Sequence, residues 1–165
     1  MSVRDAAEAL VARATALGHK GRVFTSEERQ SVAAELPIYP TWLLDLLSDF
    51  PLCGLELGWQ ASAPTPDWDG VVWIEVSDAR NIVAESRDFY PGVGILPAGY
   101  INFGGSSGSG DPYFLCVHDG DDPPIFQVYH DVGVDAATIL REGRQQVAPS
   151  LSEFFRVAVL QGERS

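Results

Sequence analysis

The run N-F-G-G-S-S-G-S-G-D-P-Y-F-L, from Asn102 to Leu115, decides how the fold is interpreted. It matches G-x-S-x-G and would make Ser106 a hydrolase nucleophile, but that motif functions only between an entering strand and a leaving helix. No helical pattern follows for about twenty residues, and the lysine of a phosphate-binding loop is absent. Glycine takes the positive φ angles of tight turns without steric cost. The run therefore predicts a connection between two strands, and the search for function moves to the surface.

On both sides of this connection the sequence predicts a sheet. Apolar residues alternate with polar ones or gather in short β-branched runs, which are the patterns of half-buried and buried strands. The alternation is clearest in C-G-L-E-L-G-W, and V-V-W-I-E-V is the clearest β-branched run. We expect strands at residues 53–59, 71–76, 95–103, 113–118 and 125–130.

Helices are predicted at both ends of the chain. Thr25 and Glu28 form a capping box, in which each side chain accepts a hydrogen bond from the other residue's backbone N–H. Ser150 and Glu153 repeat it before an apolar stripe at helical spacing. We expect helices at residues 3–17, 26–36, 41–47, 78–86 and 151–159. The fold class is then α+β: a mainly antiparallel sheet of about five or six strands, with N-terminal helices and a C-terminal helix packed against it, in a single domain over residues 1–165.

The charge of the chain excludes several classes of function. Its 165 residues carry a formal net charge of −12, and residues 30–140 contain 16 acidic residues but only two basic ones, Arg80 and Arg87. Such a protein is unsuited to neutralising phosphates, so we expect it to bind neither nucleic acid nor an anionic membrane surface. The charge either maintains solubility by self-repulsion or attracts a basic partner.

Three observations favour a cytoplasmic protein. The N-terminus M-S-V-R-D-A-A-E-A-L lacks the basic start and apolar stretch of a secretory signal. There is no apolar run of about 18 residues to form a membrane helix. Cys53 and Cys116 each stand alone in apolar surroundings, which is typical of buried thiols rather than of a disulfide.

Two His-Asp dipeptides, beginning at His118 and His130, raise the question of a metal site. If D-G-D-D-P-P closes a hairpin, His118 lies opposite Ile125. His130 then lies opposite Tyr113, and the two imidazoles are about 17 Å apart along the strands. A single zinc ion does not bridge that distance. We expect neither a metal nor another cofactor.

Glu56 and Glu75 keep an enzymatic alternative open. They lie on predicted neighbouring strands near Trp59 and Trp73, and paired carboxylates are what a glycoside hydrolase uses. Both glutamates also alternate with apolar residues, which is typical of solvated strand positions. Because the register is unknown, the sequence does not place the two carboxylates on one face. A carboxylate-dependent glycoside hydrolase stays an alternative function.

Four stretches of the chain carry a resemblance to a known family. They are E-L-P-I-Y-P-T-W-L-L-D-L-L (35–47), G-S-G-D-P-Y-F-L (108–115), P-P-I-F-Q-V-Y-H-D (123–131) and V-A-P-S-L-S-E-F-F (147–155). In this order they are similar to the SUKH superfamily, which includes bacterial immunity proteins and the fungal Smi–Knr cell-wall regulators. One departure is F-P-L-C-G (50–54), where the family often has Asn-Gly.

The resemblance implies a SUKH-like domain with a family-like core over about residues 30–160 and a further N-terminal helix at 3–17. It implies no shared catalytic centre and a role in binding another protein. In bacterial members that partner is often a toxin, which the immunity protein blocks. We therefore expect a non-enzymatic immunity protein, with a regulatory adaptor of the Smi–Knr type as the alternative. The sequence leaves the oligomeric state open.

The partner-binding residues that we expect lie in two acidic loops. If the toxin is a nuclease, its active site is basic in order to hold nucleic acid, and an acidic surface fits it by charge. A loop tryptophan can anchor an interface, whereas aspartates at the rim affect the on-rate. The alternative is that the tryptophan folds back on the core and the aspartates only shape turns. The expected residues are Asp67, Trp68 and Asp69 in the proline-rich loop, and Asp119, Asp121 and Asp122 in the hairpin turn.

Overall fold

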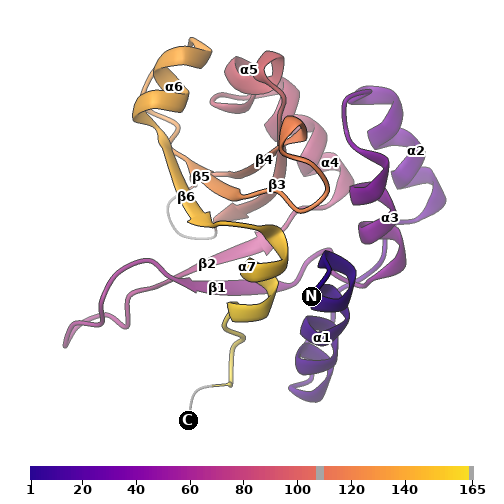
Figure 1. Cartoon of the computed structure of the whole chain (residues 1–165), viewed down its shortest axis with the longest axis vertical. Helices are drawn as coiled ribbons and strands as arrows, with labels where there is room; N and C mark the ends of the chain where they lie inside the picture. Colours follow the sequence, from indigo (N-terminus) through magenta and orange to yellow (C-terminus); the bar gives the residue numbers. More distant parts are fainter. Residues whose placement is uncertain (107–109, 164–165) are drawn as a thin grey trace.

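The sheet is an antiparallel meander. In the computed structural model, which describes residues 1–106 and 110–163, each strand pairs with the next in the order β1-β2-β3-β4-β5-β6 (Figure 1). The predicted α+β class with a mainly antiparallel sheet is confirmed. The strands are β1 (Glu56–Gln60), β2 (Val71–Val76), β3 (Tyr100–Ser106), β4 (Tyr113–Cys116), β5 (Ile125–Val128) and β6 (Arg144–Ala148).

Capping side chains explain where the main helices begin. Thr25 and Glu28 each accept a 3.1 Å hydrogen bond from the other's backbone N–H, so the predicted capping box is confirmed. Ser150 accepts from the N–H of Glu153 at 3.1 Å. Within the described residues, no helix is long and apolar enough to span a membrane. The helical segments are α1 (Val3–Ala16), α2 (Ser26–Glu35), α3 (Thr41–Asp49), α4 (Ala79–Val83), the π-helical turn η1 (Ala84–Asp88), α5 (Gly92–Ile95), the 3-10 turns η2 (Leu96–Ala98) and η3 (Val117–Asp119), α6 (Ala136–Glu142) and α7 (Leu151–Val157).

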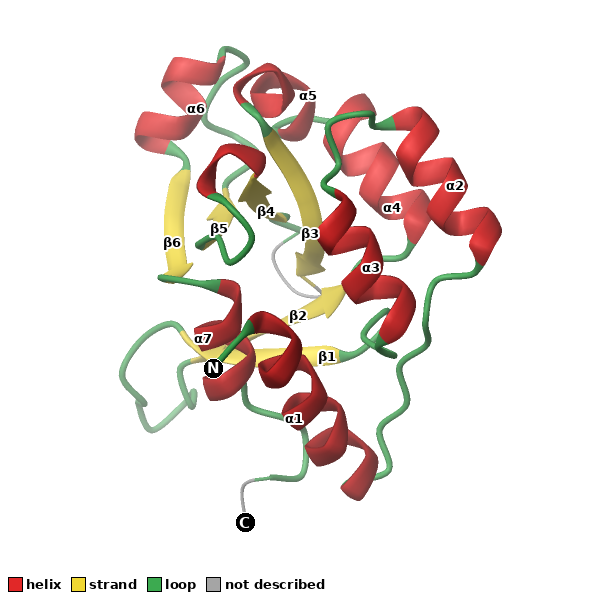
Figure 2. Cartoon of the chain, turned by 45° about the vertical axis from the view of Figure 1, so that its right-hand side comes forward, coloured by secondary structure: helices red, strands yellow, loops and turns green. Residues whose placement is uncertain are grey.

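The two faces of the sheet are covered differently. All six strands contribute to a larger core, over which α1, α3, α4 and α7 pack (Figure 2). On the opposite face, β3, β4 and β5 form a second core with Ile95 of α5 and Ile139 of α6. On β1 and β2 that opposite face carries the exposed Glu56 and Glu75. The part of the sheet formed by β3, β4 and β5 is therefore covered on both faces. The part formed by β1 and β2 is covered on one face only.

Asn102 lies at the centre of a buried hydrogen-bond network in β3. Its backbone N–H donates to Ser86 Oγ, and its side-chain carbonyl accepts from Ser77 Oγ, both at 2.8 Å. Its side-chain amide donates to the carbonyls of Gly104 and Tyr113 at 3.1 and 3.2 Å. β3 pairs with β4 up to Gly104 and with β2 from Gly104 onward, and its register with β4 shifts between Asn102 and Gly104. The network thus holds the bulge that divides the sheet.

The C-terminal segment lies along the outer strand. α7 packs beside α1 (Figure 1), and Phe154 and Phe155 of α7 are fully buried. After α7, Val159 pairs with Gly58 of β1 through two backbone hydrogen bonds of 2.8 Å. The helix expected to reach residue 159 therefore ends at Val157, because Val159 is extended beside β1.

Of the residues 53–59 expected to form a strand, only those from Glu56 onward do so. β1 begins at Glu56, because the backbone N–H of Leu55 donates back to the carbonyl of Leu52 at 3.0 Å and closes a turn. Trp59 is buried as its alternation with polar residues predicts. Alternating apolar residues therefore fixed the inward face of β1 but not its first residue.

The strand expected at 95–103 is shifted toward the C-terminus. α5 and η2 occupy the preceding residues, and Gly99, with a φ of +96°, ends them before β3 begins at Tyr100. A short apolar run does not distinguish a strand from a buried helical segment. β3 continues to Ser106, into the expected connection. Residues 107–109 of that connection lie outside the described residues.

The register expected for the β4–β5 hairpin is wrong. Phe114 pairs with Phe126, whereas the expected register would place Phe114 opposite Tyr129. The reason is η3, a helical turn that contains His118 and ends β4 early. His118 therefore does not lie at the end of a strand.

The sequence pattern predicts neither α6 nor β6. Asp135 caps α6, because its carboxylate accepts from the backbone N–H of Thr138 at 3.0 Å and from its hydroxyl at 2.9 Å. β6 has the sequence R-Q-Q-V-A and is mostly exposed. Its polar composition does not indicate a strand in the sequence, because an edge strand needs little apolar surface.

We expect Phe154→Ala to lower the free energy of unfolding by about 3–5 kcal/mol, because it removes a fully buried ring. Urea denaturation followed by circular dichroism measures the change. Val157→Ala on the same helix is the matched control, since Val157 is 50% exposed, and it should change stability by less than about 0.5 kcal/mol. A similar small effect for both variants would contradict the packing of α7 described above.

Candidate functional site

The connection between β1 and β2 forms an arm that extends beyond the sheet (Figure 1). The arm spans residues 61–70, and residues 62–69 are exposed. At its tip the carbonyl of Trp68 accepts from the backbone N–H of Thr65 at 2.7 Å and from the Thr65 hydroxyl at 3.3 Å. Trp68 is 47% exposed and belongs to neither core. The arm therefore presents a large aromatic side chain on an ordered turn.

The two aspartates beside Trp68 make different contacts. Asp67 is exposed and forms no ion pair with a described residue. Asp69 accepts from the backbone N–H of Val71 at 3.0 Å, and its backbone carbonyl accepts from Gln60 Nε2 at 2.7 Å. Asp69 thus shapes the base of the arm, whereas Asp67 presents its charge to solvent.

The other three expected residues lie in the β4–β5 connection, where one of them has a structural contact. Asp119 and Asp121 are exposed. Asp122 accepts from the backbone N–H of Ser152 at 2.8 Å and from the Ser152 hydroxyl at 2.5 Å. These two bonds tie the connection to the first turn of α7, so the carboxylate of Asp122 supports the fold.

The arm and the β4–β5 connection lie on different sides of the molecule (Figures 1 and 2). Asp121 and Asp122 border a hollow of about 440 Å³ together with Arg4 of α1 and Trp42 of α3. The expected partner-binding residues therefore form two separate surfaces. The arm is the one that projects from the sheet.

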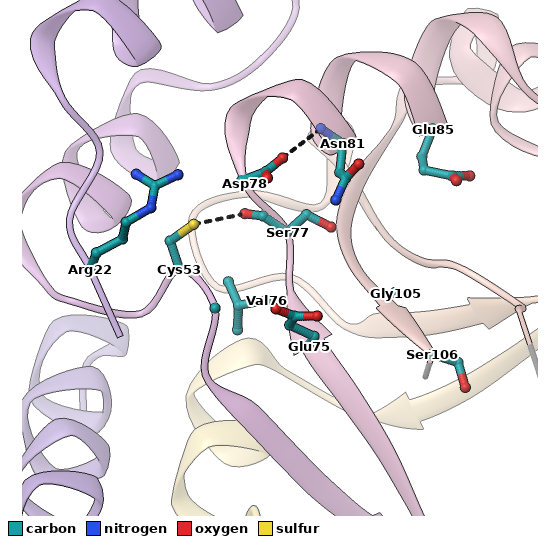
Figure 3. Close-up of a pocket in the computed structure, with 11 residues that line it drawn as sticks. Arg22, Cys53, Glu75, Val76, Ser77, Asp78, Asn81, Glu85, Gly105 and Ser106 are labelled. Carbon is teal, nitrogen blue, oxygen red and sulfur yellow. Dashed lines mark hydrogen bonds between the residues drawn. The ribbon is translucent and has the colours of Figure 1, made fainter. Parts of the chain in front are cut away.

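A cleft of about 360 Å³ opens beside β2, the end of β3 and the start of α4 (Figure 3). Its carboxylates are those of Glu75, Asp78 and Glu85, and burial raises the pKa of Glu85 above its ordinary value. Asp78 caps α4 by accepting from the N–H of Asn81 at 2.8 Å, so the helix expected from residue 78 begins at Ala79. The sequence pattern does not predict this cleft, because its lining residues come from distant segments of the chain. The only local signal is the Ser-Asp pair after β2.

The cleft also contains a thiol and a hydroxyl. The Cys53 thiol donates to the backbone carbonyl of Ser77 at 3.6 Å, and burial raises its pKa to about 11, so it is protonated at neutral pH. Ser106, at the end of β3, lines the other side. The described lining residues include no histidine. The cleft therefore does not supply Ser106 with an imidazole base.

The register of β1 and β2 brings Glu56 and Glu75 together. The two residues are direct cross-strand partners, and both are exposed. Trp73 lies opposite Gly58 on the same face. Like charges directly opposite each other destabilise an antiparallel pair. The sheet therefore carries an unfavourable acidic pair on its open face, which the sequence alone did not place.

Most of the positive charge is used within the molecule. Among the described residues, seven arginines form ion pairs with carboxylates. Three of them, Arg4, Arg29 and Arg87, each join two helical segments. More than half of the described carboxylates have no such partner. The charged side chains that remain available to contact a partner are therefore mainly carboxylates.

The two histidines of the His-Asp dipeptides have different surroundings. His130 donates its backbone N–H to Asp111 at 3.1 Å, and its Nδ1 lies 2.5 Å from the same carboxylate oxygen. This contact raises the pKa of His130. The ring of His118 lies against Gly99. Among the residues that the structure describes, no three His, Cys, Asp or Glu side chains are grouped to hold a metal ion.

The ion pair between Arg22 of the cleft and Glu28 predicts a pH dependence. Arg22 donates to Glu28 at 2.5 and 2.9 Å, and these bonds lower the pKa of Glu28 from 4.5 to about 2. Because the folded pKa is the lower one, this stabilisation is present above about pH 4.5 and is lost as the pH falls toward 2.

We therefore expect Glu28→Gln to lower the free energy of unfolding at about pH 7, and the difference from the wild type to shrink between about pH 4.5 and pH 2. Urea denaturation across this range measures it. Glu27→Gln in the same helical turn is the control, because Glu27 is exposed and has no ion pair in the described structure. A difference independent of pH would contradict the pKa shift.

Comparison with known proteins identifies no relative for this arrangement. No protein-family model, no curated protein and no solved structure matches the chain. The resemblance to the SUKH superfamily therefore rests on the four sequence stretches, and a functional assignment has to be argued from the residues of this chain.

Proposed function

We propose that this chain is a non-enzymatic protein-binding domain, acting in the cytoplasm as an immunity protein of the SUKH type that neutralises a toxin. The observation that carries the proposal is Trp68, half exposed at the tip of the arm beside Asp67, which forms no ion pair with a described residue. The SUKH-like stretches supply the expectation of a toxin partner. The surplus of unpaired carboxylates supports a basic one.

In this proposal Trp68 increases the affinity for the partner, and the exposed aspartates increase the rate of association. A tryptophan that enters a pocket of its partner commonly contributes about 2 kcal/mol or more to binding. Exposed carboxylates such as Asp67, Asp119 and Asp121 attract a basic surface and speed the encounter. If the toxin is a nuclease, the basic groove that holds its nucleic acid is the surface that fits.

We expect Trp68→Ala to raise the Kd for the toxin domain encoded by the gene directly upstream by about 30-fold, which corresponds to about 2 kcal/mol. Isothermal titration calorimetry with the purified domain measures affinity, and survival on co-expression measures protection. Leu17→Ala, at an exposed residue after α1, is the control and should bind like the wild type. Unchanged affinity and protection in Trp68→Ala would overturn the role of the arm.

Charge attraction between this chain and the toxin domain predicts a separate effect, on the rate of association. Asp67→Asn should slow association several-fold and leave dissociation nearly unchanged, because a rim charge acts on the encounter. Wild-type affinity should also fall between about 0.05 and about 0.5 M salt. Surface plasmon resonance measures the association and dissociation rates. An affinity that does not change with salt concentration would argue against a basic partner.

Two alternative functions, a regulatory adaptor and a glycoside hydrolase, predict different experimental results. If the gene directly upstream encodes no toxin with a variable C-terminal domain, a Smi–Knr type adaptor replaces the immunity proposal. The cross-strand pairing of Glu56 and Glu75 is the observation that favours a glycoside hydrolase. Hydrolysis of a chromogenic glycoside that is lost in Glu56→Gln or Glu75→Gln would replace the binding proposal altogether.

A further inference from the structure

Two cross-strand pairs lie side by side on the open face of β1 and β2. Glu56 is the direct partner of Glu75, and further along the same strands Gly58 is the direct partner of Trp73. Direct partners, and alternate residues along one strand, lie on the same face of a sheet. Trp73 belongs to neither core and is partly exposed. These four residues therefore form one surface, which we call the indole platform.

The indole of Trp73 occupies the space that Gly58 leaves free. A Cβ atom at Gly58 would lie 3.1 Å from both Cη2 and Cζ3 of the Trp73 ring, and 2.8 Å from Cγ1 of Val71. The six-membered part of the ring thus reaches from β2 across to the backbone of β1, and its neighbours hold it there. Side chains held in place before binding lose little conformational freedom when a ligand arrives.

The two carboxylates of the platform are exposed and are not used within the molecule. Neither Glu56 nor Glu75 forms an ion pair with a described residue. Two cations border the neighbouring hollows, but Arg22 is bound to Glu28, and Lys20 forms no ion pair with a described carboxylate. Like charges directly opposite each other destabilise the strand pair. A cation placed between them would relieve that repulsion.

There is room for a ligand beside these carboxylates. On β3 the partner of Glu75 is Gly105, where a Cβ atom would have no described atom within 4 Å. Glu75 and Gly105 both line the cleft of about 360 Å³ (Figure 3). Glu56 borders a separate hollow of about 220 Å³. The platform is therefore open to a side chain that enters from the solvent.

The combination of an aromatic ring with two carboxylates selects the chemistry of that side chain. An indole attracts a cation over its face, and a carboxylate binds a guanidinium through two parallel hydrogen bonds. A lysine ammonium offers a point charge but no plane to stack on the ring. We propose that the indole platform binds an arginine side chain of a protein partner, with its guanidinium against Trp73 and its N–H groups donating to Glu56 and Glu75.

This inference rests on the proposed function for the source of the arginine, which a basic toxin would supply. The platform itself contains no residue of the arm, and it can be tested without any toxin. Failure of the arginine site therefore leaves the role of Trp68 standing, and failure of the immunity proposal leaves the arginine site standing.

The probe is N-acetyl-arginine amide, titrated at constant ionic strength into the isotope-labelled full chain and followed by NMR. The acetyl amide of citrulline keeps the shape of arginine without its charge, and that of lysine keeps the charge without the plane. The test variants are Glu75→Gln and Trp73→Leu. The matched control is Glu8→Gln, because Glu8 is an exposed carboxylate of α1 that has no ion pair in the described structure.

We expect arginine to shift the backbone signals of Gly58 and Glu75 and the indole signal of Trp73, equally in the wild type and in Glu8→Gln. Both test variants should bind it at least about threefold more weakly. Citrulline and lysine should bind the wild type at least about threefold more weakly than arginine does. Glu75→Gln should also resist urea better than the wild type, since it removes one of two like charges. Its weaker binding would then not come from unfolding.

Several results would overturn the proposal. They are absence of shifts at these residues in the wild type, equal binding of citrulline or of lysine, and equal binding of arginine to Glu75→Gln. Glycoside hydrolysis that depends on Glu75, without binding of arginine, would assign the same carboxylates to catalysis instead.

Discussion

All four hydrogen bonds of Asn102 lie inside the protein, where an unmade bond costs about 1–3 kcal/mol. Two of them reach Gly104 and Tyr113 and hold the bulge at which β3 changes its neighbour from β4 to β2. The other two reach Ser77, where β2 ends, and Ser86 in η1. Because β3 is the strand shared by both halves of the sheet, this amide sets how the open half, with its acidic pair and arm, meets the half enclosed by α5 and α6.

The distribution of charge follows from that division. Seven arginines form ion pairs with carboxylates among the described residues, and three of these, Arg4, Arg29 and Arg87, tie two helical segments together. Individually such exposed ion pairs contribute little to stability, but the seven together occupy most of the 11 lysines and arginines of the chain. The carboxylates left over are distributed over the arm, the open sheet face and the cleft. The exterior is thus mainly negative because the chain carries more carboxylates than its arginines pair with, and the arm is set within it.

Local signals predicted the elements that local chemistry determines. The capping side chains of Thr25 and Ser150 bond to residues three positions away, so sequence spacing was enough to place α2 and α7. Residues 92–98 are apolar and suit a helix or a strand equally, and their packing against η1, α6 and β3 decides between them. A loop between β1 and β2 was predictable because prolines and acids surround Trp68, but whether that tryptophan is exposed was left open by the sequence. The pairing of Glu56 with Glu75 was not, because it depends on register, which a sequence pattern does not fix.

The pairing of Val159 with Gly58 has a consequence for shortened or fused forms of the chain. A sheet edge with free N–H and C=O groups is a template on which other chains add strands and aggregate. The stretch after α7 protects part of the β1 edge from such growth. Truncation before Val159, or a C-terminal tag that pulls this stretch away, would uncover that edge next to a sheet face that is already open. Such forms would be prone to assemble edge to edge, in spite of the mutual repulsion of their negative charges.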